Sequence, residues 1–301
     1  MIKAEFKRLF RKKSFYILTL ISLLLVLSWI YSTYVSGNES LARGIPYDQT
    51  SLRQLEPQNI FFQNMLQVTL SIYIFTYVIM GVIIVYDDFK EKTLLQIAVS
   101  NKNRKKYFIT KIIVLLIYNF AMIGIYLLLC LAFAFLLPNI DSSNWTALIS
   151  INTLSSIIMF WFGLSFWGLV AMAITSLTNS GIGGSCVALY LLIERIYSTN
   201  TAVTLHNPTL MRINEFLPWA NFNTLFVYAS NLKYLTSNLS EADTIANASG
   251  LSMYKLIEYN GALVPYPFFK DVGEIIVICL LFAVAVLCIF YYSYNRRISK
   301  M

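Results

Sequence analysis

Charged residues are scarce in this chain of 301 residues, where Asp, Glu, Lys and Arg make up 13% and hydrophobic residues 57%. An ordinary soluble domain has about 25% charged and about 45–50% apolar residues. The chain is therefore expected to be an integral membrane protein. Its formal net charge of +8 does not indicate a nucleic-acid partner, because in a membrane protein that sum combines two compartments.

The sequence also lacks the residues that most metal and catalytic sites need. It has one histidine, His206, and no Cys/His cluster with the spacing of a zinc site. Its four cysteines lie inside apolar runs, so a disulfide framework is not expected. No GxxxxGK[ST] motif occurs, so the chain has no P-loop of its own. We therefore expect a protein that is not an enzyme and that holds no cofactor or metal.

Long uncharged runs divide the chain into expected membrane spans. The runs 57–86 and 112–140 each exceed the roughly 20 residues that a helix needs to cross the hydrocarbon core. The run 142–193 is long enough for two spans, and the polar, glycine-rich stretch 178–184 is its best break. The expected fold is all-α with six transmembrane helices, at 14–35, 61–86, 107–137, 145–177, 181–198 and 272–294.

The segments outside these spans differ in character. Residues 1–13 place apolar and basic residues on different sides of a helix, which predicts an amphipathic helix on the membrane surface. Residues 36–60 are polar and turn-rich and are expected to form an outer loop. Residues 199–270 form a longer outer region in which we expect short helices. The other two segments are the charged loop 87–106 and the tail 295–301.

The distribution of charge predicts the orientation, because loops with an excess of Lys and Arg remain in the cytoplasm. The N-terminal segment, residues 87–111 and the tail together hold 16 basic and 4 acidic residues. The rest of the chain holds 7 basic and 11 acidic residues. We therefore expect a multi-pass protein of the plasma membrane with both termini in the cytoplasm.

Polar residues in the spans are candidates for a transport pathway. Gln63, Gln67 and Ser71 recur every fourth residue and so share one face of the second span. Hydrogen bonds between helices are the simpler explanation of that face. Charged candidates lie near the outer ends of the last two spans: Glu194, Arg195 and Glu274. An ion pair of Arg195 with Glu274 could hold an outer gate, and snorkelling to the interface is the alternative.

The loop 87–111 resembles the corresponding loop of the ABC-2 family of ABC transporter permeases. In many members that loop reads approximately E-x-G-T-L, then apolar residues, then P-V-S-R and G-K. Lys92, Asn101 and Thr110 depart from this pattern, where glycine, proline and glycine are usual. The expected topology, with a long outer segment between the fifth and sixth spans, also resembles that family. The matching residues are Glu91, Thr93, Leu94, Leu95, Arg104, Lys106 and Lys111.

The resemblance implies a cytoplasmic coupling helix that docks on a separate ATPase subunit, and ATP and Mg would bind to that subunit. A short helix at 88–99 suits this role because it offers apolar contacts within a polar rim. Binding of anionic lipid headgroups by this loop is the alternative. The resemblance also implies re-entrant helices between spans five and six. The residues expected to contact the ATPase are Phe89, Glu91, Thr93, Leu94, Leu95 and Arg104.

The implied function is ATP-driven export of an amphipathic cargo, either an antimicrobial or a toxin peptide, for export or self-immunity. Efflux of drugs or of lipid or polysaccharide precursors is one alternative, and a non-transporting immunity or sensor protein is another. A secondary transporter is disfavoured because no expected span has an ionisable residue near its midplane. The expected partners are the ATPase, a second permease copy or sister permease, membrane lipid and a peptide or lipid-like cargo.

Overall fold

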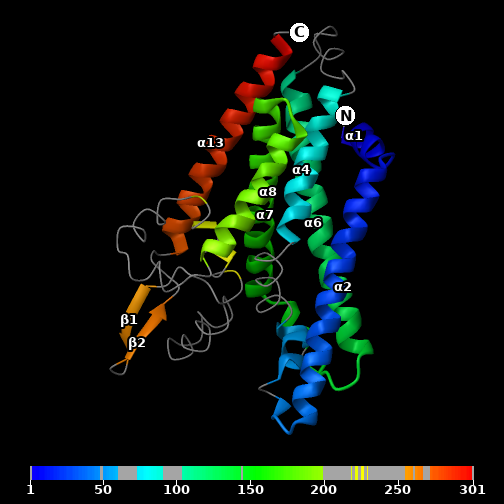
Figure 1. Ribbon diagram of the computed structural model, residues 1–301, viewed down its shortest axis with the longest axis vertical. Helices are drawn as coiled ribbons and strands as arrows, with labels where there is room; N and C mark the ends of the chain where they lie inside the picture. Colours follow the sequence, from blue (N-terminus) through cyan, green and yellow to red (C-terminus); the bar gives the residue numbers. More distant parts are fainter. Residues whose placement is uncertain are drawn as a thin grey trace.

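The computed structural model describes most of the chain as a helical bundle (Figure 1). It describes residues 2–47, 50–59, 73–90, 104–143, 145–198, 218, 221–222, 225–226, 229, 255–259, 262–266 and 272–299. The principal helices are α1 (Ile2–Leu9), α2 (Lys13–Ala42), α4 (Tyr73–Lys90), α6 (Arg104–Leu136), α7 (Ile151–Thr178), α8 (Gly181–Ser198) and α13 (Val272–Ser299). Three short 3-10 helices lie in the connections: η2 (Ser51–Leu55), η3 (Pro57–Asn59) and η5 (Trp145–Leu148).

The long helices run alternately up and down the long axis of the molecule (Figure 1). One end holds α1, the last turn of α4, the first turn of α6 and the last turn of α13, together with both chain termini. We call this the terminal end of the bundle. The opposite end holds the C-terminal part of α2 and the connections that contain η2, η3 and η5.

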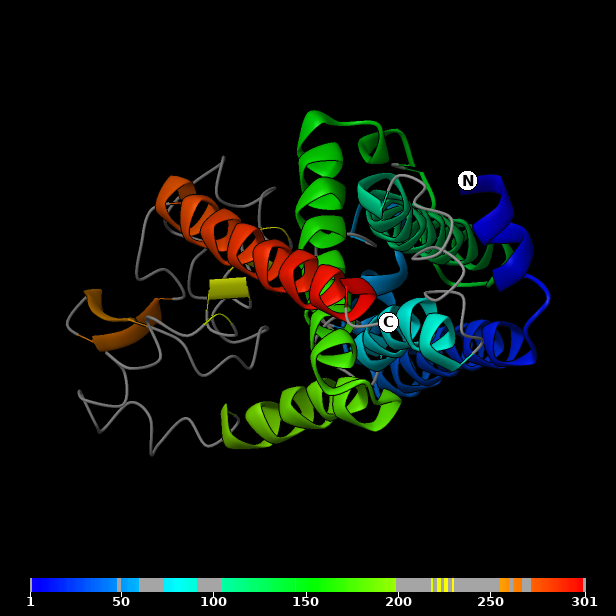
Figure 2. The same cartoon turned by 90° about the horizontal axis from the view of Figure 1, so that it is seen from above.

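α7 is the central helix of the bundle. It packs against α4, α6, α8 and α13, and every residue from Gly163 to Leu169 is buried. Because α7 contains no charged residue, it can be buried on all sides. α2 lies at the edge of the bundle (Figure 2). Both α2 and α13 expose large apolar side chains, in the way expected of helices that face lipid.

Four of the described helices are long and apolar enough to cross a membrane, namely α2, α6, α7 and α13. α4 and α8 contain shorter apolar segments, Ile74–Tyr86 and Gly181–Leu191. Residues 61–72 of the expected second span lie outside the described residues. Length and composition therefore support a membrane protein with four spans in the described part, and the number six stays a prediction.

α2 is longer than the expected first span. It continues through Ala42, so that residues 36–42 of the expected outer loop are helical. The side chain of Asn38 donates to the carbonyl of Tyr34 at 2.9 Å, and that of Ser40 donates to the carbonyl of Ser36 at 2.9 Å. These polar side chains bond one turn back within the helix, so the polar stretch does not end it.

A tight turn separates α7 from α8. The side chain of Ser150 caps α7 by accepting a hydrogen bond from the backbone N–H of Thr153 at 3.2 Å. α7 ends at Thr178, where Asn179 adopts the left-handed conformation with φ 56°. α8 then begins at Gly181. The uncharged run is therefore broken within the stretch 178–184.

The described part of the outer region 199–270 contains buried helical residues and one hairpin. The ring of Phe222 stacks on Phe166 of α7 with centroids 3.8 Å apart. Strands β1 (Lys255–Tyr259) and β2 (Ala262–Tyr266) pair antiparallel, with Tyr259 opposite Ala262. The other described elements are helical, as expected of an all-α fold, and this hairpin is a small addition to them. The overlooked signal is the sequence Asn260-Gly261, which favours hairpin turns.

α4 and α7 form the most extensive helix pair of the described part, and they approach closely at glycines. A Cβ atom added at Gly81 would overlap the backbone carbonyl oxygen of Gly168. Small residues let helix backbones pack closely within a membrane. Gly81 therefore sets the distance between α4 and α7.

Replacement of Gly81 by Ala should destabilise the bundle by about 1–3 kcal/mol, because the added methyl group meets backbone rather than a movable side chain. The measurement is the apparent melting temperature in detergent micelles. Gly124→Ala in α6 is the matched control, since nothing lies within 4 Å of a Cβ built there. Equal melting temperatures for the two variants would contradict the close approach.

Candidate functional site

Four helices bring charged and phenolic side chains together at the terminal end of the bundle. The side chains of Asp88 and Lys111 are both 0% exposed. Buried charges of this kind require close partners of opposite sign. We call this group the ion cluster, and it consists of Glu5 and Arg8 from α1, Asp88 from α4, Tyr107 and Lys111 from α6, and Tyr294 from α13.

The ammonium group of Lys111 uses all three of its donors within the ion cluster. Its Nζ donates to Oδ1 of Asp88 at 2.8 Å and to Oε2 of Glu5 at 2.9 Å. The third bond goes to the backbone carbonyl of Ile84 at 3.1 Å. An ammonium has three donors and no acceptor. The charge of Lys111 is therefore fully hydrogen-bonded, although its side chain is completely buried.

The carboxylate of Asp88, in the last turn of α4, accepts hydrogen bonds from α1, α6 and α13. Its Oδ1 accepts from Nη2 of Arg8 at 2.7 Å and from Nζ of Lys111 at 2.8 Å. The same oxygen accepts from the hydroxyl of Tyr107 at 3.1 Å. The hydroxyl of Tyr294 donates to Oδ2 at 3.4 Å. One buried carboxylate thus holds α1, α6 and α13 together.

α1 contributes one acid and one base to the ion cluster. Nη2 of Arg8 lies 3.1 Å from Oε2 of Glu5, one helical turn away. Burial alone lowers the pKa of the Arg8 guanidinium, but Asp88, Tyr107 and Glu5 together outweigh burial and raise that pKa above its ordinary value. Arg8 is therefore always protonated. The two acids and two bases of the cluster cancel in formal charge.

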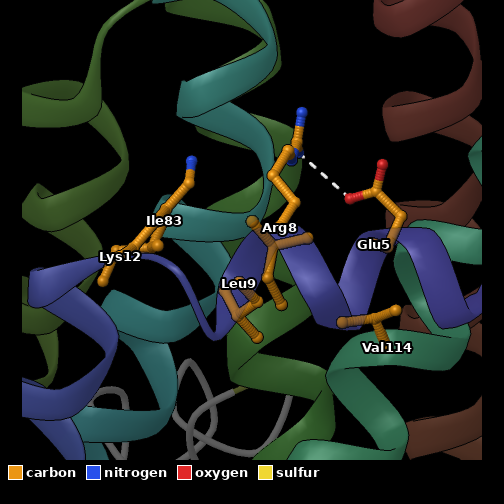
Figure 3. Close-up of a pocket in the computed structure, with 7 residues that line it drawn as sticks. Glu5, Arg8, Leu9, Lys12, Ile83 and Val114 are labelled. Carbon is orange, nitrogen blue, oxygen red and sulfur yellow. Dashed lines mark ion pairs between the residues drawn. The ribbon is translucent and has the colours of Figure 1, made fainter.

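A small notch opens beside the ion cluster, between α1, α4 and α6 (Figure 3). Figure 3 shows the nitrogen-bearing ends of Arg8 and Lys12 pointing in the same direction. The walls are thus basic in one part and apolar in another. The lining residues are Glu5, Arg8, Leu9, Lys12, Ile83, Ile84 and Val114.

The energetics of buried charge explain what the ion cluster can do. Removing an ion from water costs several kcal/mol, so a buried pair adds little net stability compared with apolar packing. Removing one partner is different, because it leaves the other charge buried and costs about 3–5 kcal/mol. The ion cluster therefore acts mainly by fixing the position of α1 relative to α4, α6 and α13.

Two members of the ion cluster lie next to the two ends of the charged loop. Asp88 is in the last turn of α4, which ends at Lys90, and Tyr107 is in the first turn of α6, which begins at Arg104. Residues 91–103 connect these two turns and lie outside the described residues. The side chains of Phe89 and Arg104 lie outside the described residues as well. Of the residues expected to contact an ATPase, Phe89 lies in the last turn of α4 and Arg104 begins α6. The others fall within 91–103: Glu91, Thr93, Leu94 and Leu95.

The structure does not bring the pathway candidates together within its described part. Glu274 lies exposed in the first turn of α13. Its hypothetical partner Arg195 and the neighbouring Glu194 lie in α8, and the side chains of both are outside the described residues. The ion pair of an outer gate therefore stays a prediction. The polar face of the second span also falls outside the described residues: Gln63, Gln67 and Ser71.

Some of the polar side chains that are described within the spans bond between helices. Nδ2 of Asn119 in α6 donates to Oγ of Ser165 in α7 at 3.1 Å. Oγ of Ser293 in α13 donates to Oγ of Ser176 in α7 at 3.0 Å. Such bonds satisfy polar groups where no water is present. Among the described residues, no group of three or more His, Cys, Asp or Glu is placed to hold a metal ion.

Sequence reasoning placed Glu5, Arg8 and Asp88 outside the spans and missed the pairing within the ion cluster. Two signals were present. Glu5 is the single acid among the first 13 residues. Lys111 lies inside the expected third span, 107–137, and a charge in a span requires a partner. Nothing in the sequence identified Asp88 as that partner rather than the adjacent Asp87.

Replacement of Lys111 by Met should destabilise the protein by about 3–5 kcal/mol, because the carboxylates of Asp88 and Glu5 lose a buried partner. The measurement is the free energy of unfolding in mixed micelles titrated with denaturing detergent. Arg43→Gln is the matched control, since Arg43 forms an exposed pair with Glu39 at 3.9 Å. A loss in Lys111→Met no larger than in Arg43→Gln would show that the ion cluster does not hold α1 in place.

Comparison with known proteins identifies the family. A sequence profile described as ABC-2 family transporter protein matches residues 1–194, which is 194 of the 301 residues. The matched segment contains every member of the ion cluster except Tyr294. No curated protein and no solved structure matches the chain. The chain belongs to the ABC-2 family of transporter proteins and is the transmembrane part of an ABC transporter.

Proposed function

We propose that this chain is the permease subunit of an exporter, driven by a separate ATPase subunit that binds residues 91–103. The family assignment supports the general role. The observation that carries the finer proposal is the position of the ion cluster at both ends of this loop. A movement of the loop would therefore be transmitted directly to the helix ends that carry Asp88 and Tyr107.

The ion cluster determines which helices follow that push. Asp88 moves with α4, and Tyr107 and Lys111 move with α6. Their bonds to Arg8 and Tyr294 draw α1 and α13 along with them. Breaking these bonds would leave charges buried without partners, so moving the four helix ends together is less costly than separating them. We propose that the ion cluster makes these helix ends one mechanical unit.

The proposed orientation places the terminal end of the bundle on the cytoplasmic side of the plasma membrane. Among the exposed side chains that the structure describes at this end, every charged one is basic. Such an excess of Lys and Arg favours the cytoplasmic side. It also places residues 91–103 where a soluble ATPase can reach them. These exposed basic residues are Lys3, Lys7, Arg11, Lys13, Lys105, Lys106 and Arg296.

We propose that the cargo is amphipathic, either an antimicrobial or toxin peptide or a lipid-like molecule. The aromatic and apolar composition of the outer region 199–270 supports this choice over a small hydrophilic ion. We further propose that a second permease, identical or a sister chain, completes the pathway. One bundle of this size offers little room for a large lumen. ATP and Mg would bind only to the ATPase subunit.

Replacement of both Leu94 and Leu95 by Asp should uncouple the ATPase from the permease. An apolar anchor at the centre of an interface contributes about 2 kcal/mol or more, so binding should weaken at least about thirty-fold. The measurements are ATPase binding to permease in nanodiscs and ATPase activity with a panel of peptide and lipid cargoes.

Ile45→Asp is the matched control for this variant, because Ile45 is an exposed apolar residue at the opposite end of the bundle. It should bind the ATPase normally. Both variants should unfold at the wild-type temperature. Normal cargo-stimulated activity in the Leu94/Leu95 variant would refute the coupling role of this loop.

Labelling of single cysteines should report the proposed orientation. The starting protein has its four free cysteines, Cys130, Cys186, Cys279 and Cys288, replaced by Ala. In intact cells a membrane-impermeant maleimide should label Ile45→Cys, whereas Leu94→Cys should react only after the membrane is opened. The reverse pattern would place the loop on the outer side, out of reach of an ATPase.

A further inference from the structure

α1 has two faces with different chemistry. The inward face carries Glu5, Arg8 and the buried Leu9, which pack toward α4 and α6. The outward face and the elbow that follows expose four basic side chains. Because the single acid of α1 bonds inward to Lys111 and Arg8, no acid of α1 balances these four charges. They are Lys3, Lys7, Arg11 and Lys13.

The elbow between α1 and α2 is held by aromatic contacts and remains partly exposed. The ring of Phe15 lies edge-on to Phe10 with centroids 5.1 Å apart, and to Tyr118 of α6 at 5.8 Å. Phe10 is 50% exposed and Tyr16 56% exposed. Exposed aromatic rings beside exposed basic residues are typical of protein at a membrane–water interface. The elbow therefore lies at headgroup depth, and its position is fixed against α6.

The surroundings favour lipid over protein as the occupant of the outward face. Below the elbow, the exposed face continues along α2 as large apolar side chains such as Ile17, Leu20 and Leu24. A phospholipid supplies both an anionic headgroup for the basic residues and acyl chains for this apolar surface. A soluble acidic partner would match the charges alone.

We propose that the outward face of α1 is a binding surface for anionic phospholipid headgroups. The four basic residues of this face supply the attraction, at about one factor of five in affinity for each basic residue near the surface.

This surface gives the lipid a regulatory role that rests on the proposed function. α1 is held on its inward face by the ion cluster and on its outward face by lipid. In a membrane rich in anionic lipid, α1 stays seated on Asp88 and Lys111, and the four helix ends move as a unit. In a neutral membrane, α1 has only its inward contacts.

The test uses the purified full chain without ATPase, ATP or cargo, so its result does not depend on the proposed function. The protein is placed in nanodiscs that contain a defined mixture of phosphatidylcholine and phosphatidylglycerol. Native mass spectrometry then counts the phosphatidylglycerol that stays bound relative to phosphatidylcholine. The test variant replaces Lys3, Lys7, Arg11 and Lys13 together by Gln.

Two control variants separate this surface from a general effect of charge. Lys105→Gln/Lys106→Gln removes exposed basic residues at the same end but on α6. In the conservative variant, Lys3, Lys7 and Lys13 become Arg, which keeps every charge. In the α1 Gln variant, the phosphatidylglycerol enrichment should fall by a factor of at least about ten. Raised salt should weaken the enrichment in the wild type. The conservative variant should retain enrichment, and the α6 variant should keep most of it.

Three outcomes would overturn the proposal. Enrichment in the α1 Gln variant could equal that of the wild type. The loss could be equal in the α6 variant, which would assign it to the general field of this end. The conservative variant could also lose enrichment although it keeps every charge, which would show that the charge of this face does not bind the lipid. Unchanged melting temperatures show that each variant is folded.

Discussion

The carboxylate of Asp88 is the group on which the terminal end of the bundle depends. It is completely buried, and a charge in that position is tolerated only if donors reach it from several sides. Those donors come from α1, α6 and α13, whose members are 80, 23 and 206 positions away in the chain. The need to satisfy one carboxylate therefore determines how four helix ends meet. The central helix α7 has no charged residue and contributes by apolar packing alone.

Hydrogen-bonded charges fix the position of α1 at this end of the bundle better than apolar contacts would. α1 has eight residues, which is too short for a stable helix in isolation, and its one buried apolar residue is Leu9. Apolar packing on that scale could not specify one position for it. Hydrogen bonds to Asp88 and Lys111 are directional, so they fix both where α1 lies and how it is rotated. A short helix with a defined seat can then move with α4 and α6 as a rigid element.

The sequence predicted those features of the structure that depend on patterns along the chain, such as runs of apolar residues. Hydropathy located the apolar helices, because a membrane demands long uncharged runs, and the family resemblance was correct. The ion cluster could not be found this way, since Glu5 and Lys111 are 106 positions apart and only the fold brings them together. The helical extension of α2 was missed because the local bonds of Asn38 and Ser40 override a turn-like composition. The hairpin at 255–266 was missed although Asn260-Gly261 lies between its strands.

The ion cluster also changes how the charge asymmetry of the chain should be read. A count over the sequence assigns Arg8 and Lys111 to the basic excess of one side, but in the structure Glu5 and Asp88 neutralise them inside the protein. The basic residues that stay exposed in the described part of this end lie on α1, on the elbow, at the start of α6 and at Arg296. Pairing the acids inward thus leaves the outer surface of α1 more uniformly positive than its sequence suggests. The same acid, Glu5, both seats α1 in the bundle and removes the negative charge that would repel an anionic headgroup.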